Sequence, residues 1–425
     1  MIKRLWLRYN RDLFLCCEET ILPYQRHASA MLTPDFDNYP ARPIASIGVH
    51  PLGLEVRYKD GQVSFHLAAD LRGHSVADDT THAVTREALL DPTHVPEGFH
   101  ISAAQLADDG FVKVTWSHKL TPSDTGQARY YSGWLYQTGL YGDADFEADL
   151  SPQLWTAETF TDIPRIDGSC VMDNEDEYFR FLKTFIRYGA VLVKGLPAVP
   201  EMIETLPEKI GVIRTSNFGR IFEVKIKADA DSNAYTGEEL RSHTDLATRE
   251  YMPGLQFLFC LQNDSDGGNS TLTDGFAVAN HIRTTDPQTF NLLSQTPIDF
   301  VNKAKTSDYR MTVPLFHLGR DGQLDEVRWT SWLRAPMRGS LDEMSRLYGA
   351  QKKAYHLGNS NEFRACFKLG VGDMICFDNR RVLHGRTSFD PTSGGRWLRG
   401  CYMEREELWS GLRIAARAKR ARQTK

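Results

Sequence analysis

Alternating apolar and polar residues predict a β-hairpin in the first part of the chain. Residues 54–58 and 63–67 each place apolar side chains at every second position, as half-buried strands do. Asp60-Gly61 between them is a residue pair typical of the tight turn that joins two hairpin strands. A further strand and an aromatic stretch are predicted at residues 111–116 and 130–136. The N-terminal part of the chain is therefore expected to be β-rich.

A helical pattern marks the start of a second domain. Apolar residues lie three and four positions apart over residues 178–185, after the acidic first turn of residues 175–177. Gly189 predicts the end of this helix, and the apolar residues 190–193 predict a buried strand after it. Alternating or continuous apolar runs predict further strands at residues 222–228, 255–261, 374–377 and 396–402. Further helices are predicted near residues 276–293, 342–355 and 404–423.

Many strands with few helices favour a mainly β fold with flanking helices, such as a sandwich or a barrel. The chain of 425 residues exceeds the size at which a single core keeps growing, so we expect more than one domain. The predicted division is an N-terminal extension over residues 1–44, a small β-rich domain over residues 45–145 and a larger domain over residues 146–425.

The composition excludes several classes of protein. Hydrophobic residues make up 41% of the chain and charged residues 25%, which is ordinary globular usage. The formal net charge of −5 provides no basic field for nucleic acid or an anionic membrane, and no apolar run is long enough to span a bilayer. The 7 cysteines lack the paired spacing of zinc clusters and disulfide frameworks. We therefore expect a cytoplasmic protein that recognises a small molecule, with no nucleic-acid or membrane partner.

A histidine and a carboxylate two residues apart are the first candidate chemistry. On a strand, His243 and Asp245 would share one face. With a second histidine such as His384 they form the two-histidine, one-carboxylate set that binds iron and leaves positions open. Arg396 follows, and its guanidinium suits a carboxylate of a dicarboxylic cosubstrate. Such spacings also arise by chance, so a core histidine and a core ion pair stay open as alternatives for His384 and Arg396.

Several motifs in order resemble one enzyme family. The stretch from His243 through PGLQFLFC and GGNSTLTDGF to FDNRRVLHGR, Arg396 and GCY is similar to the γ-butyrobetaine dioxygenase branch of the taurine-dioxygenase-like (TauD/TfdA) oxygenases. The resemblance is strong over residues 165–415. It implies a double-stranded β-helix (jelly-roll) core and a dioxygenase that uses Fe(II), 2-oxoglutarate and O2 to hydroxylate a C–H bond. The residues implied to bind Fe(II) are His243, Asp245 and His384, and those implied to hold 2-oxoglutarate are Arg396 and Ser270.

The resemblance also implies a substrate that carries a trimethylammonium group. In the family, aromatic rings surround this group because their faces attract a cation that has no N–H to donate. Tyr402 lies six residues after Arg396 on one predicted strand, so both side chains point to the same side. For Phe218 and Phe222 a place in the core is the alternative. The positions that match the aromatic cage are Phe218, Phe222, Tyr235 and Tyr402.

The other end of the substrate site departs from the family pattern. Where the family uses two asparagines to bind the substrate carboxylate, this chain has Ser232 and Thr330. The candidate substrates are γ-butyrobetaine, trimethylaminoethylphosphonate and trimethyllysine, or a neutral compound packed against Trp329 and Trp332. A non-catalytic jelly-roll binding protein is the rival class, and it would not need the complete iron-ligand set. A nucleic-acid demethylase is disfavoured by the acidic balance.

Two further expectations concern the N-terminal domain and the assembly. Members of the family often hold a structural zinc ion in the N-terminal domain with clustered cysteines. No cysteine lies between Cys17 and Cys170 here, so we expect no structural zinc. The resemblance implies a homodimer, and the predicted helix at residues 404–423 is either a dimer contact or a solvated terminal helix.

Overall fold

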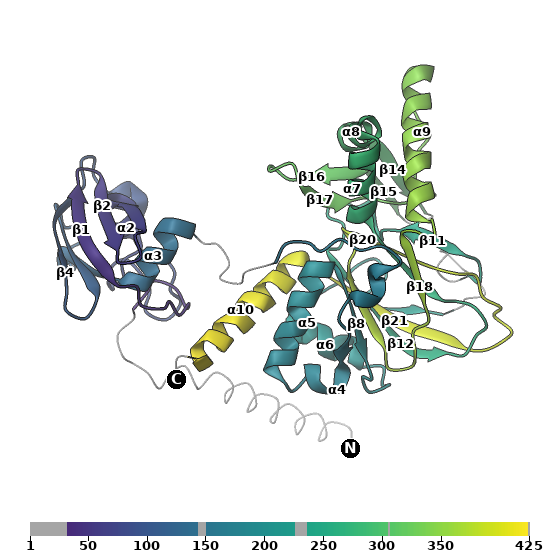
Figure 1. Cartoon of the computed structure of the whole chain (residues 1–425), viewed down its shortest axis with the longest axis horizontal. Coiled ribbons are helices and arrows are strands. Elements are labelled where there is room, and N and C mark those ends of the chain that lie inside the picture. Colours follow the sequence, from purple (N-terminus) through teal and green to yellow (C-terminus); the bar gives the residue numbers. More distant parts are fainter. Residues whose placement is uncertain (1–31, 143–149, 226–235, 305–306, 424–425) are drawn as a thin grey trace. The chain divides into compact units, whose positions relative to one another are not determined.

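The computed structural model of the chain describes residues 32–142, 150–225, 236–304 and 307–423. The described residues divide into two compact units, one within Met1–Phe146 and one within Glu147–Gln423, here termed the N-terminal unit and the C-terminal unit. The fold is mainly β with flanking helices, as predicted (Figure 1). Among the described residues, no helix combines the length and the apolar character that crossing a membrane requires.

The described part of the N-terminal unit contains two three-stranded antiparallel sheets. The predicted hairpin is confirmed, because β2 (Gly53–Tyr58) pairs with β3 (Val63–Leu67) and Gly61 in the turn has a φ of 89°, which favours glycine. The other strands are β1 (Ile44–His50), β4 (Ile101–Leu106), β5 (Phe111–Trp116) and β6 (Gln127–Tyr131). The helices are α2 (Ala68–Gly73) and α3 (Ser132–Tyr141). Alternate strand residues form one core, including Leu54, Val56, Tyr58, Val112 and Val114.

Two sheets form the framework of the C-terminal unit. In its described residues the larger sheet has the strand order β10-β21-β12-β19-β8-β7, with β9 also paired to β21, and the smaller has the order β11-β20-β13-β18. The larger sheet contains β7 (Ile166–Asp167), β8 (Ala190–Lys194), β9 (Ile213–Arg214), β10 (Ile221–Val224), β12 (Leu255–Asn263), β19 (Met374–Asp378) and β21 (Arg396–Met403). The smaller contains β11 (Leu240–His243), β13 (Ser270–Asp274), β18 (Arg364–Phe367) and β20 (Val382–Arg386).

Successive strands pass back and forth between these two sheets. The chain crosses from one sheet to the other at each step from β10 to β13, and again at each step from β18 to β21. This alternation is consistent with the predicted double-stranded β-helix. Between β13 and β18 the chain inserts three helices and two hairpins (Figure 1). These are α7 (Gly275–Thr285), α8 (Pro287–Gln295), β14 (Ile298–Lys303), β15 (Asp308–Val313), β16 (Phe316–Leu318), β17 (Leu324–Val327) and α9 (Leu341–Gly358).

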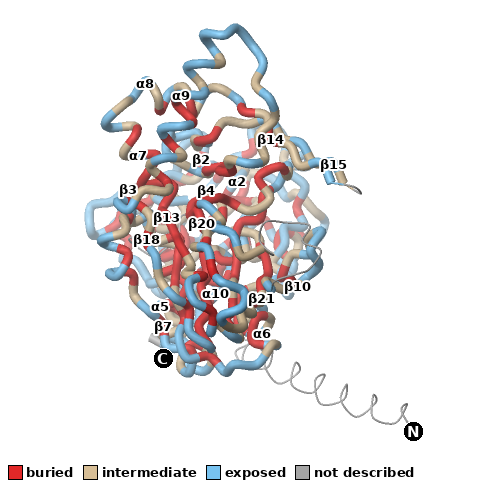
Figure 2. Tube along the Cα trace, turned by 90° about the vertical axis from the view of Figure 1, so that its right-hand side faces the viewer, coloured by how far each residue is buried: buried red, intermediate tan, exposed pale blue. Residues whose placement is uncertain are grey.

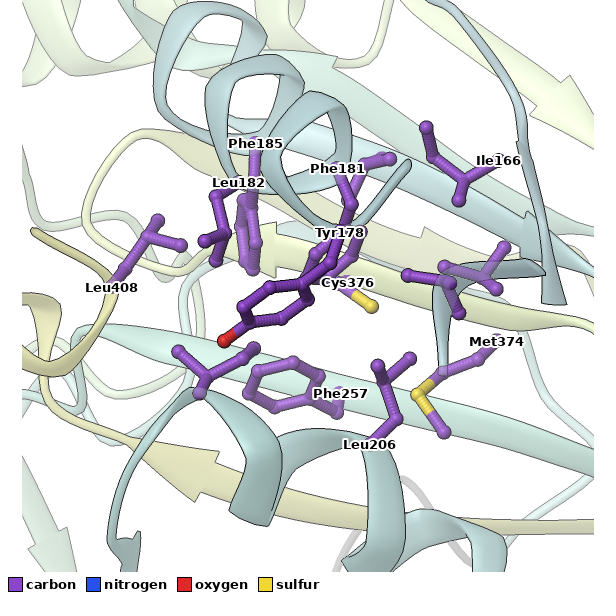
Figure 3. Packing of buried hydrophobic residues seen from close by; sticks show 14 of the residues in the cluster. Ile166, Tyr178, Phe181, Leu182, Phe185, Leu206, Phe257, Met374, Cys376 and Leu408 are labelled. Carbon is purple, nitrogen blue, oxygen red and sulfur yellow. The ribbon is translucent and has the colours of Figure 1, made fainter. Parts of the chain in front are cut away.

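Helices cover one face of the larger sheet. They are α4 (Gly168–Val171), α5 (Glu175–Tyr188), α6 (Met202–Ile210) and α10 (Arg405–Gln423). Figure 3 shows Tyr178 and Phe181 of α5 packed with Phe257 of β12 and Cys376 of β19. In Figure 1, α10 lies alongside α5, and its apolar residues Leu408, Leu412, Ala415 and Ala416 belong to the same core. The apolar side of the C-terminal helix is therefore used within the chain.

The residues at helix ends explain which helices the sequence predicts well. The predicted helix at 178–185 is confirmed as α5, which begins after Asn174, whose side chain accepts hydrogen bonds from two backbone amides, and ends at Gly189 (φ 66°). α6 is not evident from the sequence, because Pro207 lies inside it and proline disfavours helix interiors. The single helix predicted at 276–293 is wrong, because Asp286-Pro287 ends α7 and starts α8.

A second group of buried residues lies between the two sheets. Leu272 of the smaller sheet packs with Phe377 and Leu398 of the larger sheet. Figure 2 shows that β13 and β20 are buried along most of their length, whereas the peripheral loops are exposed. Side chains thus fill part of the space between the two sheets, and the rest of this space forms a cavity.

A buried ion pair joins three segments of the C-terminal unit. The Arg381 guanidinium, 2% exposed, donates two hydrogen bonds to Asp274, at 3.1 and 2.8 Å. The remaining guanidinium hydrogens bind the carbonyl oxygens of Arg187 (2.8 Å) and Gln153 (2.6 Å). Asp274 also accepts from the backbone amide of Phe276 at the start of α7. Every polar group of this pair is thus engaged directly before β20 begins.

Replacing Arg381 by leucine is expected to lower the free energy of unfolding by about 3–5 kcal/mol, because Asp274 would remain buried without its partner. Urea denaturation followed by circular dichroism measures this change. The matched control is Arg310→Leu, which removes the exposed ion pair with Asp308 and should have a far smaller effect. Equal losses in the two variants would contradict a stabilising role for the buried pair.

Candidate metal centre and substrate cavity

Two strands of the smaller sheet bring the predicted metal ligands together. His243, the last residue of β11, is paired across the sheet with His384 of β20, and their ring centroids are 4.1 Å apart. The Asp245 carboxylate approaches both imidazoles, with Oδ1 3.3 Å from Nε2 of His243 and Oδ2 3.7 Å from Nε2 of His384. One ligand atom from each residue lies within 4.8 Å of the others. A single metal ion fits this donor set of two nitrogens and one oxygen.

Asp245 lies beyond the end of the strand, not on the strand as the sequence suggested. β11 ends at His243, and the chain turns at Leu246, whose φ of 57° is unusual for a leucine. Asn379, fully buried, fixes this turn: its Oδ1 accepts from the Asp245 amide at 2.8 Å, and its Nδ2 donates to the Asp245 carbonyl oxygen at 3.1 Å. The contacts of Asn379 with the backbone of Asp245 therefore orient the Asp245 carboxylate toward the two histidines.

The protonation states of the cluster suit a metal ion. Burial, with the neighbouring His243, lowers the pKa of His384 to about 3, so this imidazole is neutral at pH 7. Burial alone would raise the pKa of Asp245, but the adjacent imidazoles and a hydrogen bond from Tyr402 hold it well below its usual range. The Nδ1–H of His243 donates to the carbonyl oxygen of Arg241 at 2.9 Å, which directs Nε2 toward the Asp245 carboxylate. A metal ion requires neutral imidazoles and an ionised carboxylate.

The three residues open into a cavity of about 110 Å³ between the two sheets. From the smaller sheet and the residues beside it, the cavity is lined by Leu240, His243, Asp245, Ser270, His384, Gly385 and Arg386. From the larger sheet and the residues beside it, the lining residues are Phe218, Phe222, Val224, Gln256, Leu258, Arg396, Leu398 and Tyr402. The structure therefore brings the predicted cosubstrate residues, Ser270 and Arg396, into the same cavity as the metal ligands.

An aromatic wall forms one side of the cavity. The rings of Phe218 and Phe222 are 6.3 Å apart, and those of Phe222 and Tyr402 are 4.9 Å apart. Gly400 of β21 permits this packing, because a Cβ atom there would lie 2.4 Å from the Phe222 ring. Three of the four predicted cage residues are thus side by side. The fourth, Tyr235, and the predicted tail residue Ser232 lie outside the described residues.

Arg396 gives the cavity a half-buried positive charge. Among the described residues, its buried Nε has no hydrogen-bond partner and no carboxylate forms an ion pair with it. Burial, with the nearby Arg386 guanidinium, lowers its pKa to about 10. Ser270 is paired across the sheet with Arg386, which also lines the cavity. A buried guanidinium nitrogen without a partner is costly, so this end of the cavity favours an anionic ligand.

The segment 328–334 serves mainly the core. Thr330 is 1% exposed and does not line the cavity. Trp329 is fully buried against Phe316 and Tyr355, and Arg328 is paired with Glu326 at 2.5 Å. The Trp332 side chain reaches the metal centre, with its ring 4.8 Å from that of His243.

Three residues near the site were missed from the sequence. Gln256 faces the cavity opposite Tyr402 in the sheet, is 2% exposed and has no partner for Oε1. Gln256 could have been found from the sequence, because it is a polar residue inside the apolar run of β12. Arg386 donates to the carbonyl oxygens of Thr236 (2.6 Å) and Glu238 (2.8 Å). Arg386 and Asn379 belong to the motif FDNRRVLHGR, but the motif did not indicate their roles, because these depend on contacts with residues far away in the sequence.

Alanine in place of His243, Asp245 or His384 is expected to weaken Mn(II) binding at least tenfold, because each variant removes one ligand of the site. Isothermal titration with Mn(II) alone measures this affinity. His281→Ala, which removes a histidine of α7 outside the cluster, is the control and should bind Mn(II) like the unmodified protein. Unchanged affinity in any of the three ligand variants would contradict the assignment.

The chain is similar to one protein family and to several known proteins. Residues 148–402 match the family model described as "Taurine catabolism dioxygenase TauD, TfdA family". The chain is 39% identical over 388 residues to the γ-butyrobetaine dioxygenase of Pseudomonas sp. (strain AK-1), covering 90% of this chain and 99% of that protein. It is 27% identical over 374 residues to the mitochondrial trimethyllysine dioxygenase of Mus musculus, covering 86% of each.

Among solved structures, an asparagine oxygenase in complex with Fe(II), 2S,3S-3-hydroxyasparagine and succinate matches with a TM-score of 0.44 and 17% identity. The match covers 54% of this chain and 79% of the other. The family resemblance predicted from the sequence motifs is confirmed by the family model and by the Pseudomonas relative. The chain belongs to the taurine catabolism dioxygenase TauD, TfdA family.

Proposed function

We propose that the protein is an Fe(II)- and 2-oxoglutarate-dependent dioxygenase that hydroxylates a C–H bond of a small trimethylammonium compound. One observation carries this proposal: the His243, Asp245 and His384 cluster opens into the same cavity as the unpaired Arg396 guanidinium and the aromatic wall. The complete iron-ligand set argues against the rival class, a binding protein without turnover, because pure binding needs no open metal positions.

Each part of the cavity has a role in this proposal. The two imidazoles and the carboxylate would hold an iron ion and would leave further positions for ligands. Bound iron and 2-oxoglutarate would supply the oxidising chemistry, with O2 as the oxidant. The Arg396 guanidinium and the Ser270 hydroxyl would hold the far carboxylate of 2-oxoglutarate, since a guanidinium can donate two parallel hydrogen bonds to a carboxylate.

The aromatic wall supports a cationic head group on the substrate. Ring faces attract a quaternary ammonium group, which has no N–H to hydrogen-bond. Phe218, Phe222 and Tyr402 supply three faces, and we propose Tyr235 as the fourth residue of the cage. The low polarity of the wall, with Leu258 and Leu398 beside it, would also exclude water from the reacting carbon.

The structure constrains the anionic end of the substrate less than it constrains the cationic head group. The Pseudomonas relative is a γ-butyrobetaine dioxygenase and the mouse relative a trimethyllysine dioxygenase. Ser232 and Thr330 replace the two asparagines of the family pattern, and Thr330 is buried outside the cavity lining. We rank γ-butyrobetaine first, because the chain is more similar to the Pseudomonas relative than to the mouse relative. Trimethylaminoethylphosphonate and trimethyllysine follow. A neutral substrate near Trp332 is the second candidate, because that indole lies against His243.

We further propose a cytoplasmic homodimer without a structural zinc ion, in which residues 146–425 form the catalytic domain and residues 45–145 a smaller domain. The scattered cysteines, which lack the spacing of a disulfide framework, support the cytoplasmic location. The family resemblance supports the dimer. The burial of Leu408 and Leu412 within the core makes the C-terminal helix a weaker dimer contact than the sequence suggested.

A panel of substrates tests the proposed function. The protein is loaded anaerobically with Fe(II) and 2-oxoglutarate, then given O2 with γ-butyrobetaine, trimethylaminoethylphosphonate, trimethyllysine or a tert-butyl analogue in separate reactions. We expect succinate to form in equal amounts with an oxidised trimethylammonium product for at least one cation. Succinate coupled only to oxidation of the neutral analogue would contradict the proposed substrate class.

Arg396→Lys is expected to reduce the apparent affinity for 2-oxoglutarate about tenfold or more. Lysine keeps the charge but loses the planar pair of donors, and a charged hydrogen bond contributes roughly 1.5–3 kcal/mol. Arg399→Lys on the opposite face of β21, where Arg399 pairs with Glu223, is the control and should not change this affinity. If Arg396→Lys altered only the affinity for the second substrate, Arg396 would be a partner of the substrate anion.

Phe222→Leu is expected to weaken binding of a trimethylammonium substrate by roughly tenfold to thirtyfold, because a desolvated cation–π contact contributes up to about 2 kcal/mol. Titration of the metal-loaded protein with γ-butyrobetaine, or with the cation that proves to be the substrate, measures the effect. The tert-butyl analogue tests whether the ring acts through the charge, since its affinity should change little. Equal weakening of both compounds would mean that the wall provides only apolar packing.

A further inference from the structure

Tyr402 occupies an unusual position for a residue of an aromatic wall. It is 2% exposed, and its hydroxyl donates a hydrogen bond to Oδ2 of Asp245 at 2.7 Å. The two residues are far apart in the sequence and come from different sheets of the double-stranded β-helix: Tyr402 lies on β21, and Asp245 directly follows β11. A cation–π contact uses only the face of the Tyr402 ring and does not require the hydrogen bond from the hydroxyl to Asp245.

The hydrogen bond distinguishes the two oxygen atoms of Asp245. Oδ2 accepts from Tyr402 and lies 3.7 Å from His384, whereas Oδ1 lies 3.3 Å from Nε2 of His243 and accepts no hydroxyl. Asn379 holds the backbone of the same residue through its amide and its carbonyl oxygen. The carboxylate is therefore fixed at its backbone by Asn379 and at one oxygen by Tyr402, which leaves Oδ1 available.

We propose that Tyr402 is a positioning residue of the metal centre. Its hydroxyl occupies Oδ2 of Asp245 and thereby presents Oδ1 as the single carboxylate ligand of the metal ion. The inference rests on the proposed function and deepens it, because the same side chain also supplies one face of the substrate cage. Hydrogen bonds to a ligating side chain commonly change metal affinity tenfold to a hundredfold. A monodentate carboxylate keeps one more position open than a bidentate carboxylate would.

The neighbours of Tyr402 keep its ring in place without relying on the hydroxyl. The Phe222 ring packs on it with a centroid distance of 4.9 Å, and Gln256 lies opposite it in the sheet. Phenylalanine at position 402 would retain this packing and remove only the hydrogen bond to Asp245. The hydroxyl and the ring can therefore be tested separately in the full-length chain.

Tyr402→Phe and Phe222→Leu form the matched pair of variants. Isothermal titration with Mn(II) alone should show an affinity about tenfold to a hundredfold lower for Tyr402→Phe and little changed for Phe222→Leu. The visible spectrum at saturating Co(II), which reports the ligand geometry and not the affinity, should change only in Tyr402→Phe. Binding of γ-butyrobetaine to the metal-saturated protein should show the opposite order, with the larger loss in Phe222→Leu.

Two results would overturn the proposal. One is a Tyr402→Phe protein with unchanged Mn(II) affinity and an unchanged Co(II) spectrum, which would make Tyr402 a wall residue only. The other is a lowered affinity with an unchanged spectrum at saturation, because that would indicate a general loss of stability and no change in the carboxylate. Failure of the unmodified protein to bind Mn(II) would instead overturn the proposed function itself, so the two failures are distinguishable.

Discussion

The pairing of His243 with His384 across β11 and β20 is the contact on which the rest of the site depends. It joins residues that are far apart in the sequence, and closing such a long loop costs entropy that only a stable framework offsets. The helix-covered core of the larger sheet supplies that framework, and the buried Arg381–Asp274 pair anchors the chain just before β20. Asn379 and Tyr402 then add the carboxylate of Asp245 to the two imidazoles.

The cavity concentrates polar groups that the protein leaves without partners. Arg396 has no carboxylate near it among the described residues, and Gln256 has a buried amide oxygen without a donor. Buried polar groups are destabilising unless they are satisfied, so their presence around the metal ligands indicates ligands that satisfy them. The aromatic wall, in contrast, favours a cation that needs no hydrogen bond. The two ends of the cavity thus suit different partners, an anionic cosubstrate and a cationic substrate.

Much of the fold and part of the site followed from the sequence. The hairpin β2–β3, the helix α5 and the strands β5 and β12 were evident from periodicity, because their side chains alternate between core and solvent or fill the core completely. α6 could not be recognised from the sequence, because Pro207 lies inside it. The helix predicted at residues 276–293 is two helices, because Asp286-Pro287 ends α7 and starts α8. The metal ligands came from the order of motifs. Asn379 and the hydroxyl of Tyr402 could not be predicted, because their roles arise only when distant segments meet.

The most direct test is diffraction from crystals grown with Mn(II) and 2-oxoglutarate, measured at the manganese absorption edge. The account predicts one anomalous peak in contact with Nε2 of His243, Nε2 of His384 and Oδ1 of Asp245, and a 2-oxoglutarate carboxylate bound to the Arg396 guanidinium. A peak at another place in the chain, or 2-oxoglutarate bound away from Arg396, would contradict it.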